Sequence, residues 1–249
     1  MSVQIITGDC REVLAWMPEA SFDAIVTDPP YQQTSLAWDR WPDGWPAAAR
    51  RVLKPTGSMW VFGSLRMFLE RRDEFAGWRL AQDIVWEKHN GSSFHRDRFR
   101  RVHEQAVQFY RDDAPWAEVY KGEVVTMDAT KKQVRRKLRP THMGRIEAGH
   151  YTSEDGGPRL MRSVIFVRSE HGRAVHPTQK PLGIVEPLIV NACPSGGTVL
   201  DPFFGSGTTG AAANILGRRC IGIEADPAYA ALARQRINGE APLFAAAAE

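Results

Sequence analysis

The sequence predicts an α/β fold built around a mostly parallel, doubly wound β-sheet. Short apolar runs rich in β-branched residues alternate with segments of helical periodicity in both the first and the last third of the chain. Several of these runs end in a turn with an acidic residue, as at Gly8-Asp9 and Asp28-Pro29-Pro30. Because sheets of this kind bind ligands at the carboxyl ends of their strands, the chemistry is expected in the turns that follow strands.

The first third of the chain alternates strands with helices. Val13, Leu14 and Met17 repeat at helical spacing before Pro18, which predicts a short helix between the first two strands. The expected strands are residues 3–6, 22–27, 58–62 and 82–86, and the expected helices are residues 11–17, 45–53 and 65–75.

This alternation stops after residue 87 and returns near residue 163. Residues 88–157 are basic and poor in long apolar runs, so we interpret them as an insertion with a separate task. Beyond it, the expected strands are residues 163–167, 198–201 and 219–224, and the expected helices are residues 182–191, 209–216 and 227–236, before an Ala-rich tail that is expected to fray. The predicted organisation is a first half at 1–87, an insertion at 88–157 and a second half at 158–249.

The composition is that of a globular protein with its own core. Of 249 residues, 43% are hydrophobic and 24% are charged. The cysteines Cys10, Cys193 and Cys220 form no CxxC pair, so neither a disulfide framework nor a metal site is indicated. The N-terminus lacks a basic leader followed by an apolar stretch, and no long apolar run occurs, so a cytoplasmic protein is expected.

Charge is distributed unevenly along the chain. Residues 88–145 hold 14 Lys or Arg against 7 Asp or Glu, a net charge of +7, whereas the total is +3 and the remainder is therefore at −4. A basic segment in an otherwise acidic chain is consistent with a polyanionic partner, and a merely solvated surface stays an alternative.

A glycine-rich turn follows the expected strand at 198–201 and opens a helix. Glycine lets the backbone approach a ligand closely, and a helix N-terminus offers unpaired N–H groups to an anionic group. Glu224 stands 19 residues after Gly205, at the end of the next strand, where a nucleotide-binding fold places an acid on ribose hydroxyls. The turn reads Asp201-Pro202-Phe203-Phe204-Gly205-Ser206-Gly207-Thr208-Thr209, which matches neither the nicotinamide nor the ATP fingerprint.

A second turn, Asp28-Pro29-Pro30-Tyr31, combines hydrogen-bond acceptors with an aromatic ring. The prolines remove two backbone donors and leave carbonyl groups beside a carboxylate. Such acceptors can orient an amino group on an aromatic ring and return electron density to its nitrogen. This arrangement favours attack by an amino group on an electrophile, and an ordinary Pro-Pro turn stays the alternative.

Two shorter motifs are less specific. The run His176-Pro177-Thr178-Gln179-Lys180-Pro181 precedes a helix, and its Thr and Lys can meet a small anionic group. After the opening strand, Asp9 in Gly8-Asp9-Cys10 can accept from an adenine amino group or cap the next helix.

In this order, DPPY at 28–31, the basic insertion, HPTQKP at 176–181 and DPFFGSGTT at 201–209 resemble the β class of DNA amino-methyltransferases, which modify adenine N6 or cytosine N4. The resemblance covers nearly the whole chain, including RVLKPTG at 51–57 and IGIE at 221–224. It implies a Rossmann-like fold that uses S-adenosylmethionine, with circularly ordered motifs and seven strands, one of them antiparallel.

The resemblance also implies roles for individual residues. Asp28 and the Pro29 carbonyl would accept the target amino hydrogens, with Pro30 in the same turn and Tyr31 stacked on a flipped base. In the cofactor site, Glu224 would bind ribose hydroxyls, Asp9 and Cys10 would hold the adenine beside Ile223 and Ala225, and Thr178 and Lys180 would help at the carboxylate. The full cofactor set is Asp9, Cys10, Thr178, Lys180, Asp201, Phe203, Gly205, Ser206, Gly207, Thr208, Thr209 and Glu224.

By the same resemblance, residues 88–157 would recognise the target DNA. Candidate contacts are Asn90, His95, Arg96, Arg98, Arg100, Lys131, Lys132, Arg135 and Arg136, with Arg101, Gln105 and Gln133 as further candidates. A solvated surface role stays open for each. The loop that carries Trp38, Trp41 and Trp45 is expected to close over the base or wedge the duplex, with burial in the core as an alternative for Trp45.

We therefore predict a site-specific methyltransferase for adenine N6 in double-stranded DNA. The choice of adenine follows from Asp28, because cytosine-N4 relatives more often have serine there. An N4-cytosine methyltransferase, an inactive nucleic-acid-binding relative and a dehydrogenase-like nucleotide enzyme stay open as alternatives. A homodimer is expected, and the question of a partner restriction nuclease is left open.

Overall fold

The computed structural model describes residues 3–92, 96–136, 149–170 and 179–238. It divides into two compact units, Met1–Gly122 with Ser163–Glu249, and Glu123–Arg162. The expected Ala-rich tail lies outside the described residues.

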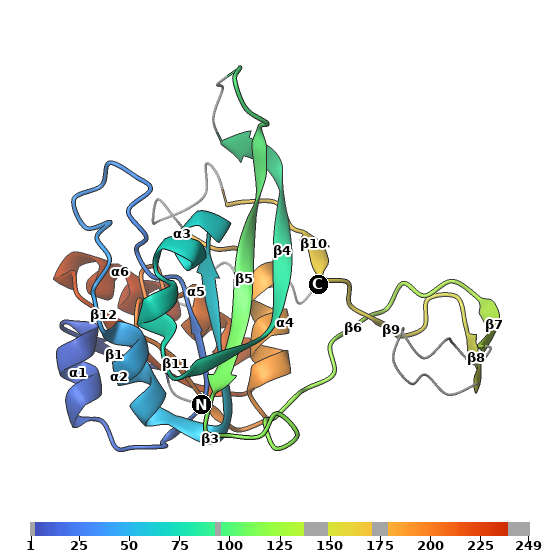
Figure 1. Ribbon diagram of the computed structural model, residues 1–249, viewed down its shortest axis with the longest axis horizontal. Helices are drawn as coiled ribbons and strands as arrows, with labels where there is room; N and C mark the ends of the chain where they lie inside the picture. Colours follow the sequence, from blue (N-terminus) through green and yellow to red (C-terminus); the bar gives the residue numbers. More distant parts are fainter. Residues whose placement is uncertain (1–2, 93–95, 137–148, 171–178, 239–249) are drawn as a thin grey trace. The chain divides into compact units, whose positions relative to one another are not determined.

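The larger unit is built on one mixed sheet (Figure 1). In spatial order its strands are β1 (Val3–Thr7), β12 (Arg219–Glu224), β11 (Thr198–Asp201), β2 (Phe22–Thr27), β3 (Leu53–Gly63), β5 (Arg101–Arg111), β4 (Trp78–Ser92) and β10 (Val164–Phe166). Only β5 runs antiparallel to its neighbours, which confirms the expected mostly parallel sheet with one antiparallel strand. The described sheet has eight strands where seven are predicted.

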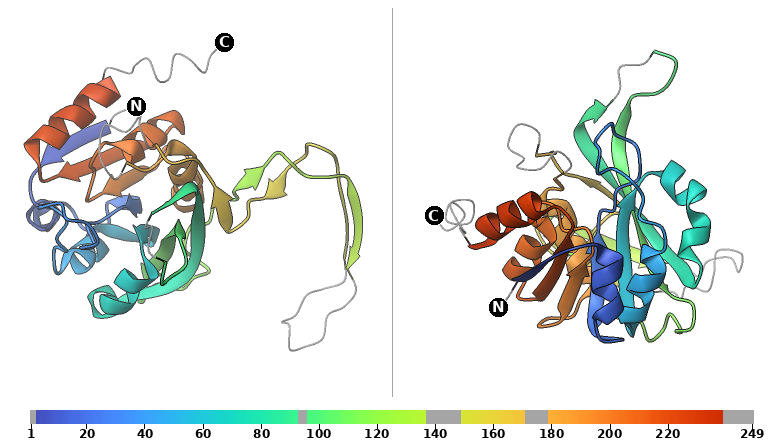
Figure 2. Two further views of the ribbon diagram at one scale, coloured as in Figure 1. Left: turned by 90° about the horizontal axis from the view of Figure 1, so that it is seen from above. Right: turned by 90° about the vertical axis from the view of Figure 1, so that its left-hand side faces the viewer.

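Helices cover both faces of this sheet (Figure 2). One face carries α1 (Cys10–Trp16), α2 (Trp45–Val52) and α3 (Leu65–Glu70) with the 3-10 turn Arg72–Phe75, and the other carries α4 (Leu182–Ala192), α5 (Thr208–Ile215) and α6 (Pro227–Asn238). The doubly wound arrangement is therefore confirmed, except that the helix expected at 65–75 breaks at Arg71.

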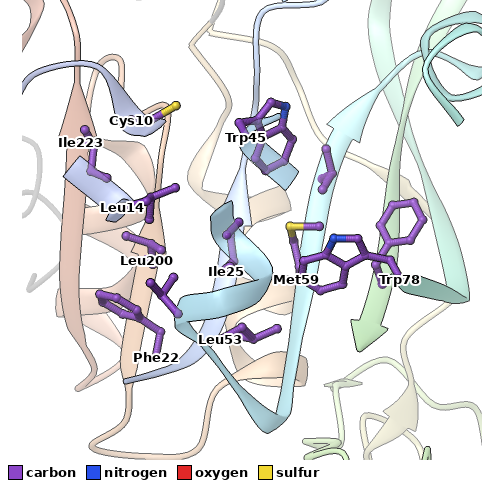
Figure 3. Packing of buried hydrophobic residues seen from close by; sticks show 14 of the residues in the cluster. Cys10, Leu14, Phe22, Ile25, Trp45, Leu53, Met59, Trp78, Leu200 and Ile223 are labelled. Atoms are coloured by element: carbon purple, nitrogen blue, oxygen red, sulfur yellow. The ribbon is translucent and has the colours of Figure 1, made fainter. Parts of the chain in front are cut away.

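The core on the α1 and α2 face is built from alternating strand residues and the apolar sides of the helices (Figure 3). Leu14 and Trp45 are fully buried and pack above strand residues such as Ile25 and Met59. Arg51 on α2 donates to the carbonyls of Leu14, Ala15 and Met17, so it satisfies the open end of α1. This packing fixes the positions of the turns after β1 and β2.

The smaller unit, residues 123–162, consists of two short antiparallel pairs. Strand β6 (Val125–Thr126) pairs with β9 (Arg159–Leu160), and β7 (Lys132–Arg136) pairs with β8 (Gly149–Ser153). These boundaries differ from the predicted insertion at 88–157, because β4 and β5 continue through residue 111 as strands of the main sheet. No helix in the described parts of the chain is long and apolar enough to cross a bilayer.

Candidate active site

A cavity opens at the carboxyl ends of β1, β2, β11 and β12, where turn chemistry is expected. The sheet order brings these four turns together although they lie far apart in the sequence. Of the predicted site residues, the cavity is lined by Asp9, Cys10, Asp28, Pro30, Lys180, Asp201, Phe203, Gly205, Ser206, Thr208, Thr209 and Glu224, together with Ile223 and Ala225.

Three described site residues, Pro29, Tyr31 and Gly207, are not among those that line this cavity, although Pro29 and Gly207 belong to turns that form it. Thr178 falls outside the described residues. Tyr31 packs against the hydrophobic core, and burial raises the pKa of its hydroxyl. Its expected stacking on a base stays a prediction.

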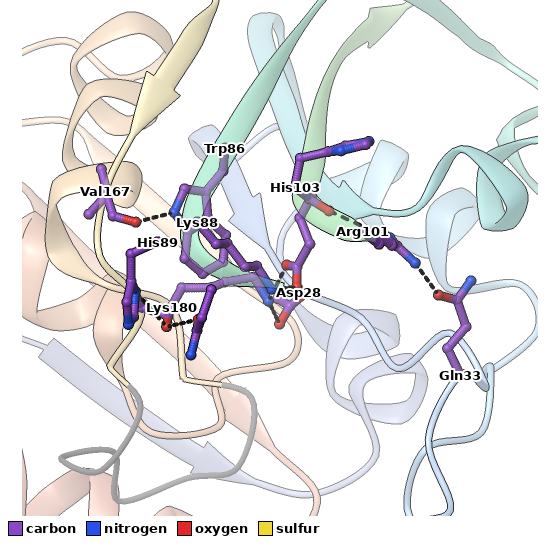
Figure 4. A network of polar contacts seen from close by, with 12 residues as sticks. Asp28, Gln33, Trp86, Lys88, His89, Arg101, His103, Val167 and Lys180 are labelled. Atoms are coloured by element: carbon purple, nitrogen blue, oxygen red, sulfur yellow. Dashed lines mark hydrogen bonds and ion pairs between the residues drawn. The ribbon is translucent and has the colours of Figure 1, made fainter. Parts of the chain in front are cut away.

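A buried chain of charges surrounds Asp28 (Figure 4). The Lys180 ammonium pairs with Asp28 Oδ2 and lies 3.4 Å from Glu104 Oε2, while Glu104 Oε1 accepts from Lys88. Lys180 also lies over the Phe62 ring, with its Nζ 5.2 Å from the ring centre. Two carboxylates and two ammonium groups thus balance one another largely away from bulk water.

The protonation of this chain follows from its geometry. Burial raises the pKa of Asp28, with Lys180 opposing and Glu104 reinforcing the shift. Burial alone would raise the pKa of Glu104, but Lys180 and Lys88 lower it to about 2. Burial would lower the pKa of Lys180, but Asp28 and Glu104 raise it, so Lys180 is cationic at neutral pH.

The second oxygen of Asp28 has no such partner. Among the described residues, Asp28 Oδ1 is buried without a hydrogen-bond donor. An unsatisfied buried acceptor costs roughly 1 to 3 kcal/mol, so its natural complement is a donor brought by a ligand. An amino group that enters the cavity beside Asp28 supplies such a donor.

The glycine-rich turn after β11 is shaped by its own backbone. Gly207 adopts φ 79°, in the left-handed region, and its added Cβ would lie 3.2 Å from Ile237 Cδ1 and Phe204 Cε1. Its N–H donates to Phe204 O at 2.8 Å, and α5 starts at the next residue. The turn therefore directs the N-terminus of α5 toward the cavity.

Glu224 joins this turn to the one after β12. Its carboxylate accepts from Gly205 N at 2.7 Å and from Asp226 N at 2.9 Å. Burial raises the pKa of this carboxyl group, and the two backbone donors oppose the shift. Each carboxylate oxygen keeps acceptor capacity, so binding of ribose hydroxyls is compatible with this second, structural role.

At the first turn, Asp9 caps α1 and also lines the cavity. Its Oδ1 accepts from Arg11 N at 2.8 Å, and the side-chain bonds from Arg11 lower its pKa. The helix-cap alternative is thus confirmed without excluding a ligand role. Burial raises the pKa of the Cys10 thiol to about 12, which makes it a poor nucleophile.

The residues that line the cavity suit S-adenosylmethionine in charge and in polarity. Its lining holds five acidic side chains and two basic ones, which suits a cationic sulfonium. Phe203 and Ile223 offer apolar walls, and Glu224 offers acceptors. Asp201, whose pKa burial raises to about 6, already accepts from Thr27 and Phe203 N.

The three tryptophans at and before the start of α2 differ in burial. Trp41 and Trp45 are buried in a cluster with Phe75, so the expectation that they close over a base or wedge the duplex is wrong for these two. Trp45 packs edge-on against Phe75, and the Trp41 ring is tilted against both of these rings. Trp38 remains 37% exposed and lines the cavity.

The predicted DNA-contact residues fall into two groups. Asn90, Arg96, Arg98 and Arg100 belong to the hairpin between β4 and β5, with Arg101 and Gln105 on β5 itself. Lys131, Lys132, Gln133, Arg135 and Arg136 lie at or in β7 of the smaller unit. His95 lies outside the described residues.

Comparison with known proteins decides the family. The model of the N6/N4 methyltransferase family, described as DNA methylase, matches residues 22–235. The chain belongs to the N6/N4 DNA methylases. S-adenosylmethionine is accordingly its methyl donor, and the predicted membership is confirmed.

Individual relatives of this DNA methylase agree over nearly its whole length. It is 30% identical to the type II methyltransferase M.HinfI of Haemophilus influenzae, over 94% of this chain and 68% of that protein. The M1.HpyAVI–SAM complex matches at a TM-score of 0.64 and 27% identity, over 95% of this chain and all of that one. The PvuII cytosine-N4-specific DNA methyltransferase shares the fold at a TM-score of 0.65 and 18% identity.

Sequence reasoning missed Glu104 and Lys88 in this site. Both lie in the stretch interpreted as an insertion, where no motif distinguishes them from the surrounding charges. A signal was present in the pattern of β5, whose Ala106, Val107 and Phe109 are apolar enough for a strand. Only the pairing of β5 with β3 and β4 shows that Glu104 faces Lys180.

Proposed function

We propose that this DNA methylase transfers a methyl group to the N6 amino group of adenine in double-stranded DNA, with the base flipped out of the helix. The buried, partnerless Oδ1 of Asp28 carries this proposal, because among the described residues it is an acceptor placed for one amino hydrogen. Asp28 itself supports adenine over cytosine, because serine is the more frequent residue at this position in the resembling N4 enzymes.

The residues around Asp28 orient the amino group. Asp28 Oδ1 accepts one hydrogen and the Pro29 carbonyl accepts the other, so the nitrogen lone pair is turned away from the ring and toward the cofactor side of the cavity. Lys180 holds Asp28 Oδ2 and opposes the rise in pKa that burial causes, which favours the ionised carboxylate. An electrophilic methyl group would come from the sulfonium, which would leave as a neutral thioether. The amino group needs no deprotonation before attack, and the methylated nitrogen then releases its extra proton to the Asp28 carboxylate to which it is hydrogen-bonded.

The cofactor would occupy the turns on the β1, β11 and β12 side. We assign the methionine part to residues 201–209, the ribose hydroxyls to Glu224 and the adenine to Asp9 and the backbone at Cys10, beside Ile223 and Ala225. Lys180 is also predicted at the cofactor carboxylate. Its contacts with Asp28 and Glu104 support a place on the substrate side instead.

The DNA would contact the two groups of basic residues described above, whose arginine and lysine side chains suit phosphates. A homodimer is proposed only from the family resemblance.

Identifying the modified nucleoside tests the choice of base. Unmethylated, amplified genomic DNA is incubated with the protein and S-adenosylmethionine, digested to nucleosides and analysed by mass spectrometry. N6-methyl-2′-deoxyadenosine is expected, and N4-methyl-2′-deoxycytidine as sole product would establish the alternative that the PvuII enzyme illustrates. Absence of any methyl transfer would favour an inactive DNA-binding relative.

A further inference from the structure

The hairpin between β4 and β5 extends beyond the sheet as a free two-stranded ribbon (Figure 1). Pairing of β5 with β3 ends at Gly63↔Gln105, and pairing of β4 with β10 ends at Phe166↔Glu87. The β4 and β5 strands continue to pair as far as Ser92↔Arg101. Residues 88–92 and 101–104 therefore form the ribbon, and residues 96–100 form the described part of its tip.

The ribbon rises from the edge of the sheet that carries the active site. Because β5 is antiparallel, its first residues lie where the parallel strands end, and Asp28 follows the end of β2. Arg101 Nη1 donates to Gln33 Oε1 at 3.1 Å, which ties the ribbon to the loop after the DPPY turn (Figure 4). The base of the ribbon is therefore joined to the segment that follows the catalytic turn.

On the other side, the ribbon is held by the segment that leads to Lys180. Trp86 Nε1 donates to Val167 O at 2.8 Å, and Ser169 Oγ donates to Asn90 Oδ1 at 3.2 Å. The buried pair of Lys88 and Glu104 fixes its base from within. These contacts on both sides hold the base of the ribbon in a fixed position relative to the sheet.

The tip combines one fully exposed aromatic ring with several cationic groups. Phe99 is 100% exposed, and Arg96, Arg98 and Arg100 around it are exposed as well. Within 96–101 four arginines stand against Asp97 alone, a net charge of +3. Burial of a phenylalanine side chain stabilises a protein by roughly 1.5 to 3 kcal/mol, and the exposed Phe99 makes no such contribution to the fold. Stability of the fold therefore does not explain a phenylalanine at this position.

Charge and shape together indicate what covers this ring. Guanidinium groups suit phosphates on both sides of a groove, and a phenyl ring suits the face of an unstacked base. Extruding a base costs a few kcal/mol and leaves a gap in the stack, which apolar wedges are known to fill.

We propose that Phe99 is a DNA wedge that inserts into the base stack next to the target base, while the tip arginines hold the flanking phosphates. The inference rests on the proposed function and adds to it the element that stabilises the flipped state. Neither a second copy of the chain nor a lipid surface offers the flat, polyanionic stack that this arrangement matches.

The test compares Phe99→Ala and Phe99→Trp with a matched control, Trp16→Ala. Trp16 is a 64% exposed aromatic residue at the end of α1, on the opposite edge of the sheet from the cavity. The recognition site is first mapped by modification-sensitive sequencing of amplified genomic DNA methylated by the wild type. Two duplexes then carry this site, one with the target base paired and one with it opposite an abasic residue.

Single-turnover methyl transfer and 2-aminopurine fluorescence beside the target are measured on both duplexes. On the paired duplex, Phe99→Ala is expected to lose roughly tenfold in rate and in fluorescence gain, because stacking on a base is worth roughly 1 to 3 kcal/mol. On the abasic duplex, where no pairing has to be broken, the loss should shrink to about twofold or less. Phe99→Trp and Trp16→Ala should resemble the wild type on both.

Three outcomes would overturn the wedge. The first is a wild-type rate for Phe99→Ala on the paired duplex. The second is an equal loss on both duplexes, which would indicate a general binding role. The third is a dimer that Phe99→Ala converts to a monomer in sedimentation, which would place a second copy on the ring. If the wild type itself transfers no methyl group to any DNA, the proposed function fails, and the wedge with it.

Discussion

At the residue scale, the site depends on one carboxylate with two different oxygens. Asp28 Oδ2 pairs with Lys180, whereas Oδ1 is buried without a partner among the described residues. Burial raises the pKa of Asp28 and the Lys180 ammonium opposes this shift, so the ion pair favours the charged carboxylate. Protonation of Asp28 would weaken its acceptor function.

Replacing Asp28 by alanine should therefore separate chemistry from cofactor binding. We expect methyl transfer to fall by roughly 10² to 10³-fold, the usual effect of removing one preorganised electrostatic interaction, or further. Calorimetry should show nearly unchanged affinity for S-adenosylmethionine, because Lys180 keeps Glu104 as a partner. Transfer at the wild-type rate would contradict the amino-group geometry.

The charged neighbours of Asp28 allow a test in which two variants shift the pH dependence of methyl transfer in opposite directions. Glu104 raises the pKa of Asp28, and Lys88 lowers it. Transfer requires ionised Asp28, so the rate falls as pH drops through its pKa. Glu104→Gln should move this acid limb to lower pH, and Lys88→Met should move it to higher pH.

Single-turnover rates across the pH range measure both limbs, with thermal melting at each pH to verify folding. General structural damage would lower the rates of both variants without moving their acid limbs in opposite directions. Shifts of the same sign in the two variants would rule out electrostatic tuning of Asp28 by this chain of charges.

At the element scale, the proposed cofactor site and the proposed DNA contacts lie on different kinds of element. The cofactor is assigned to turns held by the sheet, and DNA is assigned to the β4–β5 hairpin and to β7. The glycine-rich turn owes its shape to Gly207 and to the bonds from Gly205 and Asp226 to Glu224. In the smaller unit, by contrast, Lys132 and Arg135 of β7 have exposed side chains. Lys131, next to this strand, pairs with Glu154 at 3.8 Å.

Neutralising the β7 strip should weaken DNA binding mainly through counterion release. The variant changes Lys131, Lys132, Arg135 and Arg136 to glutamine. We expect the slope of log K against log salt to become shallower by about 0.9 for each DNA phosphate that is no longer neutralised. Titrations of labelled duplex at several salt concentrations give this slope.

The control for this variant neutralises Arg79 and Arg219, exposed residues near the amino ends of β4 and β12 and so away from the cavity edge. It should leave the slope as in the wild type. An unchanged slope in the β7 variant would remove this strand from the DNA interface.

At the scale of the whole molecule, the cofactor cavity lies entirely within the larger unit. Ligand that binds only the folded state stabilises it by roughly 2.7 kcal/mol at one hundred times its dissociation constant. S-adenosylmethionine should therefore slow hydrogen exchange in β1, β11 and β12. Exchange in β7 and β8 should not respond, because those strands contribute nothing to the cavity.

Hydrogen exchange read by mass spectrometry, with and without cofactor, measures these effects by segment. S-adenosylhomocysteine serves as a control ligand that lacks the transferable methyl group. Protection of β7 and β8 by the cofactor alone would show coupling between the two units that their separate packing does not predict.

The sequence by itself determined the fold class and the family, and it predicted the turns that line the cavity. Asp28 to Tyr31, Asp201 to Thr209 and Glu224 are readable because each lies at the end of a strand whose apolar pattern is local, and because a turn of this chemistry needs those residue types. The boundaries of most strands and helices follow from the same local periodicity.

Only the tertiary structure decided the rest. It placed Lys180 on Asp28, 152 residues away, added Glu104 and Lys88, and buried Trp41 and Trp45. It also brought β5 into the main sheet. There the buried side-chain amide of Gln108 donates to Ser58 and Asn191, which satisfies a polar group in the core. Local pattern cannot reveal such contacts, because a polar residue is satisfied in a core only by partners that the fold brings from elsewhere.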